Sequence, residues 1–229
     1  MCGRYVQDPD DEIIFFEHFK IPFEGELREI WKRRYNVAPT QFSVVVRDRG
    51  MGREAAFLRW GLVPSWAKDP AIGSRMINAR SETLTEKPSF RTAFKRRRCI
   101  VPATGYYEWR KLAKGKQPYH IGLRDKAPMA FAGLWESWST PEGDPLESYT
   151  IITCPANEAT KQLHDRMPVV LAPDDYERWL APGNEDVKAL QGLLKPFADE
   201  PIVSYPVSTV VNSPRNDVPG CVERVEPEA

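Results

Sequence analysis

The sequence has no long hydrophobic run. Its longest apolar stretches, such as residues 100 to 103, are far shorter than the roughly 20 residues needed to cross a bilayer. Nothing near the start resembles a signal peptide, which combines a basic segment with an apolar one. We therefore expect a cytoplasmic protein that has no contact with a membrane.

Residues spaced to bind metal are also lacking. The cysteines lie far apart without any C-x-x-C spacing, and the three histidines show no ligand spacing either. Neither a zinc site nor a disulfide framework is indicated. We expect no metal and no other cofactor, and the sequence leaves the role of Cys99, Cys154 and Cys221 open.

An excess of charge is the third absence, because 32 basic residues balance 32 acidic ones. A zero net charge argues against a generic polyanion binder, which would bind polyanions whatever their structure. The distribution is less even, since residues 32 to 34 and 95 to 98 are compact basic runs. Such runs are either solvated faces or parts of one basic face that suits a phosphate backbone, and the sequence alone leaves both open.

Proline, in contrast, is abundant and scattered, with 21 copies in 229 residues. Spread prolines break a chain into short elements and argue against a helical bundle. Residues 42 to 47 and 55 to 62 are predicted to form the two strands of a hairpin. The aspartate-rich residues 8 to 11 are predicted to cap a helix that buries Ile13, Ile14, Phe16 and Phe19. Residues 156 to 163 are predicted to form another short helix. The whole chain, residues 1 to 229, is predicted to be a single α+β domain with a mainly antiparallel, barrel-like β core flanked by short helices.

The first residues carry the most distinctive chemistry. Removal of Met1, which is usual before a small residue, would leave Cys2 with a free α-amine beside its thiol. With ordinary pKa values of about 8 and about 8.5, both groups are partly nucleophilic near neutral pH. Amine and thiol can condense with one aldehyde, first as an imine and then as a five-membered thiazolidine ring.

Two further residues suit proton transfer. Glu108 follows Gly105 on an expected strand between Tyr107 and Trp109, and desolvation there would raise its carboxyl pKa toward the range useful in acid–base chemistry. The alternative is plain strand alternation with Glu108 at the surface. His164 lies in a polar turn where it could titrate, whereas His120, inside an expected strand, is interpreted as structural.

Several motifs together give the chain a family resemblance. They run in order over nearly its whole length: Met1-Cys2-Gly3-Arg4, Tyr35-Asn36-Val37-Ala38-Pro39-Thr40, Arg59-Trp60-Gly61-Leu62-Val63-Pro64, Asn78-Ala79-Arg80-Ser81-Glu82-Thr83, Arg98-Cys99-Ile100-Val101-Pro102-Ala103, Gly105-Tyr106-Tyr107-Glu108-Trp109, Phe131-Ala132-Gly133-Leu134-Trp135 and His164-Asp165-Arg166-Met167-Pro168. This set resembles the SOS-response-associated peptidase family, the abasic-site processing proteins. The resemblance implies a barrel-like α+β fold, a basic groove for single-stranded DNA, and a thiazolidine crosslink between the N-terminal cysteine and the aldehyde of an abasic site.

The reaction then assigns roles to four residues. Glu108 would move the protons that open the closed abasic sugar, and the α-amine of Cys2 would attack the aldehyde. His164 would donate a proton as water leaves. Asn78, which both donates and accepts hydrogen bonds, would hold Cys2 in one orientation.

The resemblance also implies the DNA contacts. Arg4 and Arg80 are expected to bind phosphate, while Trp66 and Pro39 would stack on or wedge against neighbouring bases. Such a wedge predicts single-stranded DNA with abasic sites, including single-to-double-strand junctions, as the partner. We expect a monomer without a protein partner, associated with the nucleoid when it engages DNA.

Three alternatives remain. A class II glutamine amidotransferase also begins with a nucleophilic cysteine, but Asn78-Ala79 is not the Asn-Gly pair expected for its oxyanion hole. A self-processing peptidase would have almost nothing to remove, because only Met1 precedes Cys2. A non-catalytic binder of single-stranded DNA would leave Glu108 and His164 structural.

Overall fold

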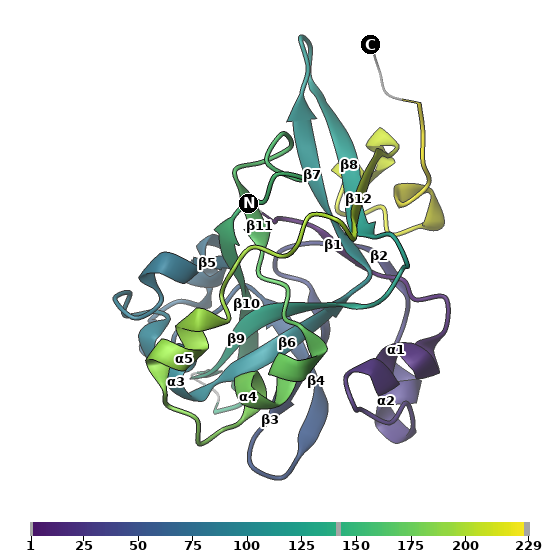
Figure 1. Cartoon of the computed structure of the whole chain (residues 1–229). Helices are drawn as coiled ribbons and strands as arrows, with labels where there is room; N and C mark the ends of the chain where they lie inside the picture. The colour runs from purple at the N-terminus through teal and green to yellow at the C-terminus, as the bar shows by residue number, and fades with distance from the viewer. Residues whose placement is uncertain (1, 141–142, 227–229) are drawn as a thin grey trace.

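Two β-sheets form the centre of the computed structural model, which describes residues 2 to 140 and 143 to 226 (Figure 1). In the first sheet every pair of neighbouring strands is antiparallel. Its strands, in spatial order, are β12 (Ile202–Pro206), β8 (Lys116–Leu123), β7 (Gly105–Lys111), β1 (Tyr5–Gln7) and β2 (Arg34–Val37).

The second sheet closes on itself. Its ring consists of β10 (Pro145–Pro155), β4 (Arg53–Trp60), β3 (Phe42–Asp48), β6 (Arg98–Ala103) and β9 (Met129–Ser139), and β9 pairs back onto β10. Pairing within the ring is antiparallel except between β4 and β10. The predicted α+β class with a mainly antiparallel, barrel-like core is confirmed, as is the hairpin of β3 and β4.

Two short strands extend β10 toward one end of the ring. β5 (Asn78–Arg80) runs parallel to it, and β11 (Arg166–Pro168) runs antiparallel. Both pair with β10 around Thr153, opposite Arg80 in one case and Pro168 in the other. Segments far apart in the sequence are thereby brought to one end of the barrel.

A buried hydroxyl cluster ties the first strand to the ring. The hydroxyl of Tyr5 lies 2.6 Å from Oγ of Ser43 and 2.7 Å from the hydroxyl of Tyr149. All three residues are almost completely buried, so each hydroxyl satisfies the others where water is excluded. This cluster fixes β1, and therefore the residues just before it, relative to the barrel.

Short helices surround the sheets. They are α1 (Glu12–His18), α2 (Gly25–Ile30), α3 (Arg91–Arg96), α4 (Tyr176–Leu180) and α5 (Val187–Gly192), with 3-10 turns η1 (Pro70–Arg75), η2 (Ser81–Thr83), η3 (Pro173–Asp175), η4 (Thr209–Asn212) and η5 (Pro219–Cys221). Within the described residues, no helix combines the length and the apolar character needed to span a membrane.

The predicted cap of the first helix is confirmed, and Phe16 and Phe19 are buried as expected, but Ile13 and Ile14 are not. The Asp11 side chain accepts hydrogen bonds from the backbone of Ile13 and Ile14, as an N-cap does. Phe15 and Phe16 are buried, whereas the two isoleucines are more than half exposed. The helix spans only 7 residues, so its first turn extends beyond the core.

The helix predicted over residues 156 to 163 is wrong, because the segment consists of turns. The side chain of Asn157 accepts hydrogen bonds from both the backbone nitrogen and the hydroxyl of Thr160. Asparagine competes in this way with regular helical bonding and favours a turn. The turn leads directly to His164.

Candidate functional site

Cys2 lies beside the first residues of β7. Tyr5 pairs with Tyr106, and the backbone nitrogen of Tyr107 donates to the carbonyl of Arg4 at 3.0 Å. Continuing this antiparallel register brings the residues before Arg4 alongside Glu108. The thiol of Cys2 is fully buried and donates to the Arg4 carbonyl, with Sγ and oxygen 3.8 Å apart.

Burial determines the protonation state of this thiol. It raises the pKa of Cys2 well above its ordinary value, and the nearby Glu108 carboxylate raises it further. Cys2 is therefore a thiol near neutral pH, held close to a carboxyl that can accept its proton.

Asn78 contacts the backbone of Cys2 directly. Nδ2 of Asn78 donates to the Cys2 carbonyl at 2.8 Å. Its Oδ1 is buried and has no hydrogen-bond partner among the described residues. Because β5 holds Asn78 against Ile151 of β10, the amide is a fixed support for Cys2 with one acceptor still unused.

Glu108 is buried, with 4% of its surface exposed, so the alternative that places it at the surface is wrong. Both faces of β7 are covered here, as Tyr106 and Tyr107 are fully buried too. Burial raises the pKa of Glu108 to about 7. A carboxyl with this pKa can both give and take a proton near neutral pH.

His164 lies in the turn before β11. Its Nδ1 is 2.9 Å from the backbone nitrogen of Arg166 and 2.8 Å from Oδ1 of Asp165. When Nδ1 accepts from the backbone, the neutral ring carries its proton on Nε2. When Nδ1 is protonated it becomes a donor, and the carboxylate of Asp165 can accept its hydrogen bond. Burial lowers the pKa of His164, which keeps the ring neutral near pH 7. Asp165 also raises the pKa of Glu108, so the turn lies close to that carboxyl.

An ion pair next to His164, between Arg166 and Glu82, was not predicted from the sequence. Arg166 binds both carboxylate oxygens of Glu82 and donates to the carbonyl of Thr153 at 2.6 Å. This pairing lowers the pKa of Glu82 to about 2. Both residues stand in the quoted motifs, but their contact depends on β5 and β11 flanking the same strand, which neither motif reveals.

The residues predicted to contact DNA differ in how available they are. Arg4 donates to Oδ1 of Asn36 at 3.0 Å and to the carbonyls of Val211 and Asn212 at 2.8 and 3.2 Å, and its guanidinium lies over the ring of Trp109. Much of its donor capacity thus holds the C-terminal segment.

Arg80, in contrast, is exposed and makes no side-chain hydrogen bond or ion pair with any other described residue. Trp66 projects from its loop with 58% of its surface exposed. Pro39 is partly buried and precedes Thr40, whose φ of 71° marks a sharp turn. A protruding indole and an unpaired guanidinium are chemically suited to a base and a phosphate.

The chain has clear relatives. A family model described as SOS response associated peptidase (SRAP) matches residues 1–214. The abasic site processing protein YoqW of Bacillus subtilis is 46% identical over 226 residues, covering 97% of this chain and 99% of that protein. The abasic site processing protein HMCES of Xenopus tropicalis is 37% identical over 196 residues, covering 76% of this chain and 58% of that protein. A solved structure from Bacteroides thetaiotaomicron superposes with a TM-score of 0.86 at 28% identity, covering 98% of this chain and all of that one.

Proposed function

This chain belongs to the SOS response associated peptidase family, and we propose that it processes abasic sites in DNA by forming a covalent crosslink through Cys2. Met1, whose removal the reaction requires, lies outside the described residues. The observation that carries the proposal is the burial of Cys2 beside a carboxyl of raised pKa, with Asn78 bonded to the Cys2 backbone. Relatives named abasic site processing proteins support the choice of substrate.

The first step opens the sugar. An abasic deoxyribose is mostly a closed hemiacetal, so the hydroxyl on its C1′ must lose a proton while the ring oxygen gains one. Glu108 suits both transfers, because a group with a pKa of about 7 is populated in both forms near neutral pH. The product is a free aldehyde within reach of the Cys2 amine.

The second and third steps form the link. The α-amine of Cys2 adds to the aldehyde carbon, and His164 carries the two protons that the amine nitrogen loses to the aldehyde oxygen, which leaves as water and yields the imine. The sulfur then adds to the imine carbon, and its proton passes to the nitrogen with Glu108 as relay. One water is lost overall, and the thiazolidine removes the imine before β-elimination can cut the strand. The lesion is shielded by the protein, and the same groups can reverse the reaction slowly.

Asn78 acts as a positioning residue in this scheme. Its bond to the Cys2 carbonyl limits the rotation of a terminus that would otherwise sample many conformations. Holding the amine near the aldehyde converts a bimolecular encounter into an intramolecular one, which contributes several kcal/mol to the barrier reduction.

The DNA partner is proposed to be single-stranded or a junction between single- and double-stranded DNA. Trp66 and Pro39 would stack against bases beside the lesion, while Arg80 and the remaining donors of Arg4 bind phosphate. A protruding wedge disfavours an intact duplex on one side. We propose that the protein acts as a monomer, and at the nucleoid when engaged.

The test is the intact mass of the protein before and after incubation with a single-stranded oligonucleotide that carries one abasic site. We expect a chain that begins at Cys2 to gain the oligonucleotide mass minus one water, in an adduct that survives denaturation. Cys2→Ala should give no such adduct, while Cys221→Ala, another buried cysteine, is the matched control and should react normally.

The outcomes separate the alternatives. A chain that retains Met1 should not react, since its Cys2 nitrogen is an amide. An adduct that hydrolyses readily, or a cut strand, would remove the thiol from the mechanism. No adduct with a chain that begins at Cys2 would overturn the proposal, and glutamine hydrolysis and unreactive DNA binding would then be measured. Release of residue 1 by the chain itself would reveal peptidase activity.

A further inference from the structure

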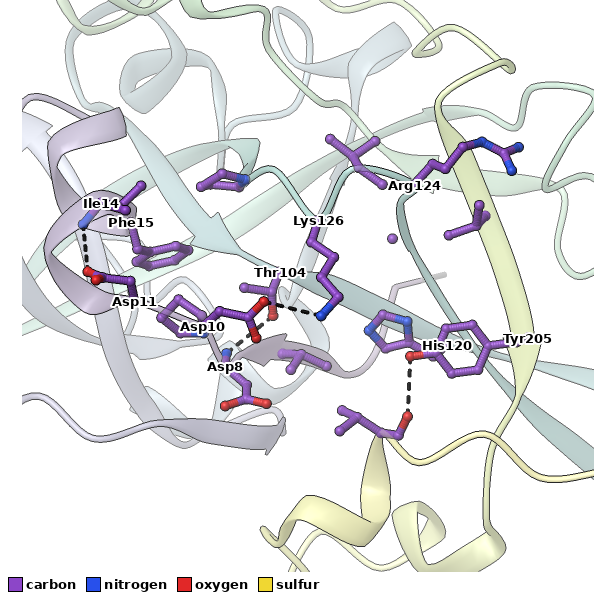
Figure 2. A pocket seen from close by; sticks show the side chains of 17 residues that line it. Asp8, Asp10, Asp11, Ile14, Phe15, Thr104, His120, Arg124, Lys126 and Tyr205 are labelled. Carbon is purple, nitrogen blue, oxygen red and sulfur yellow. Dashed lines mark hydrogen bonds and ion pairs between the residues drawn. The ribbon is translucent and has the colours of Figure 1, made fainter.

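A cavity lies on the face of the first sheet that is opposite to Cys2. Its volume is about 450 Å³, within the range of small-molecule sites, and Phe15, Thr104, His120, Arg124, Lys126 and Tyr205 are among its lining residues (Figure 2). His120 pairs with Tyr107 across the strands, so the two side chains share a face. Glu108 is the next residue along β7 and therefore points to the other face. The cavity is thus separate from the proposed crosslinking site.

His120 is one of the polar residues that line this cavity. It is 8% exposed, and its Nδ1 is sealed from solvent without a hydrogen-bond partner among the described residues. Burial lowers the pKa of His120 to about 4, so the ring is neutral at physiological pH. Buried ring nitrogens normally have partners, because an unpaired polar group inside a protein costs free energy.

The surrounding sequence makes room for this ring. A Cβ on Gly105 would lie 2.3 Å from Nε2 of His120, and one on Gly122 would lie 3.0 Å from Cε1. His120 also stacks on Tyr205, with ring centroids 5.0 Å apart, and meets the edge of Tyr107. The contacts with Tyr205 and Tyr107 therefore fix the orientation of the imidazole, and the absence of side chains at Gly105 and Gly122 leaves room for it.

The cavity is lined by charges of both signs, namely the carboxylates of Asp8, Asp10 and Asp11 and the cations Arg124 and Lys126. Arg124 is exposed and has no side-chain partner among the described residues, and Figure 2 shows its side chain extending away from His120 and Lys126. Lys126 reaches across to Asp10, 3.2 Å from its carboxylate, in an ion pair that is exposed on both sides. Such a pair contributes little and exchanges readily for another anion. Asp11 is occupied as the cap of α1.

We propose that this cavity binds a planar heteroaromatic ligand with a negatively charged group, the chemistry of a nucleotide. The ring would enter between the His120–Tyr205 stack and Phe15, and hydrogen-bond to Nε2 of the imidazole, because Nδ1 is sealed from solvent. The anionic group would remain at the mouth with Arg124 and Lys126. The ligand is either a free mononucleotide or one nucleotide of a bound strand.

Selective labelling gives a direct test, because the chain has only three histidines. Protein labelled with ¹⁵N-histidine is titrated with adenosine monophosphate, with adenosine, and with an oligo(dA) strand without abasic sites, and the ring ¹⁵N signals are followed by NMR. We expect saturable shifts of His120, with His18 as the internal reference for all three probes; His164 belongs to the proposed crosslinking site, so its signal reports separately on strand binding there. Adenosine should bind about tenfold more weakly, because it lacks the charged group. Shifts with the mononucleotide indicate a free ligand, and shifts with the strand alone indicate a bound one.

Variants keep the test independent of the histidine signal. Val203, which lines the cavity from β12, is changed to Phe to fill it, and His120→Phe removes the ring nitrogens. Both should weaken binding, measured by calorimetry, about tenfold or more. His18→Phe is the matched control, since His18 bonds to Tyr176 outside the cavity, and it should bind normally.

The proposal is overturned if no probe shifts His120 saturably up to about 10 mM, where nonspecific contacts dominate, or if Val203→Phe and His120→Phe bind as the wild type does. Crosslinking by Cys2, measured on the same samples, is expected to be unchanged in Val203→Phe. Failure of nucleotide binding would therefore leave the function proposed for Cys2 intact, and the reverse also holds.

Discussion

Replacement of Glu108 by glutamine should change how the stability of the protein depends on pH. Glutamine preserves the size of the side chain and removes its charge. Glu108 is 4% exposed, and burial raises its pKa from 4.5 to about 7. The protonated carboxyl is thus favoured in the folded state, so its contribution to stability is complete below pH 4.5 and disappears as pH rises through 7.

The size of the effect follows from the two pKa values. Between pH 5 and pH 8 the folded carboxyl loses most of its proton, while the unfolded carboxyl has already lost its own. With values of 4.5 and about 7, the wild type loses about 2 to 3 kcal/mol of unfolding free energy from this one group across that interval. Glu108→Gln has no such group, and the groups whose pKa values Glu108 shifts, Cys2 and Tyr106, stay protonated across this interval because burial raises their pKa values.

The assay is urea unfolding of both proteins at pH 5 and pH 8. The stability of Glu108→Gln relative to the wild type should rise by about 2 to 3 kcal/mol between the two conditions. Equal pH dependence in both proteins would refute the reasoning, because Glu108 would then titrate alike in the folded and unfolded chains. The same variant should crosslink to abasic DNA more slowly at both pH values.

Three further changes probe other parts of the site. Asn78→Ala removes the bond to the Cys2 carbonyl, worth about 1 kcal/mol, so single-turnover crosslinking should slow about fivefold or more; an unchanged rate would contradict its positioning role. Trp66→Ala should weaken binding to single-stranded DNA by about 1 to 3 kcal/mol in fluorescence anisotropy and leave the melting temperature unchanged, because the indole is 58% exposed. In Glu82→Gln the acid sensitivity that comes from the Arg166 pair should disappear: that contribution is present above pH 4.5 and lost as pH falls toward 2, and identical acid unfolding curves would argue against it.

The sequence predicted which residues lie together at the candidate site better than it predicted their environment. Cys2, Asn78 and Glu108 were found by their chemistry and their motifs, and the structure brings them together at one end of the barrel. Alternation along β7 could not decide whether Glu108 faces water, because aromatic residues occupy both faces of that strand. The answer depends on which segments cover each face, and those segments are distant in the sequence.

Long-range contacts explain the other differences. Arg4 was assigned to phosphate, yet its strongest acceptor is the carbonyl of Val211, 207 residues away. No local pattern near Arg4 signals this contact. The turn at residues 156 to 163 was missed for a local reason, since the helix prediction did not weigh the side chain of Asn157, which favours a turn.

The hydrogen bonds between Arg4 and the C-terminal segment determine when, during synthesis, the strand that follows Cys2 becomes fully supported. Arg4 and Asn36 are held by backbone carbonyls of Val211 and its neighbours, and a ribosome adds Val211 at a point 207 residues after Arg4. Until then, the strand that carries Cys2 lacks part of its support. A nascent chain with an exposed aminothiol would therefore be poorly ordered for capture of an aldehyde, and full reactivity would arrive with the completed fold.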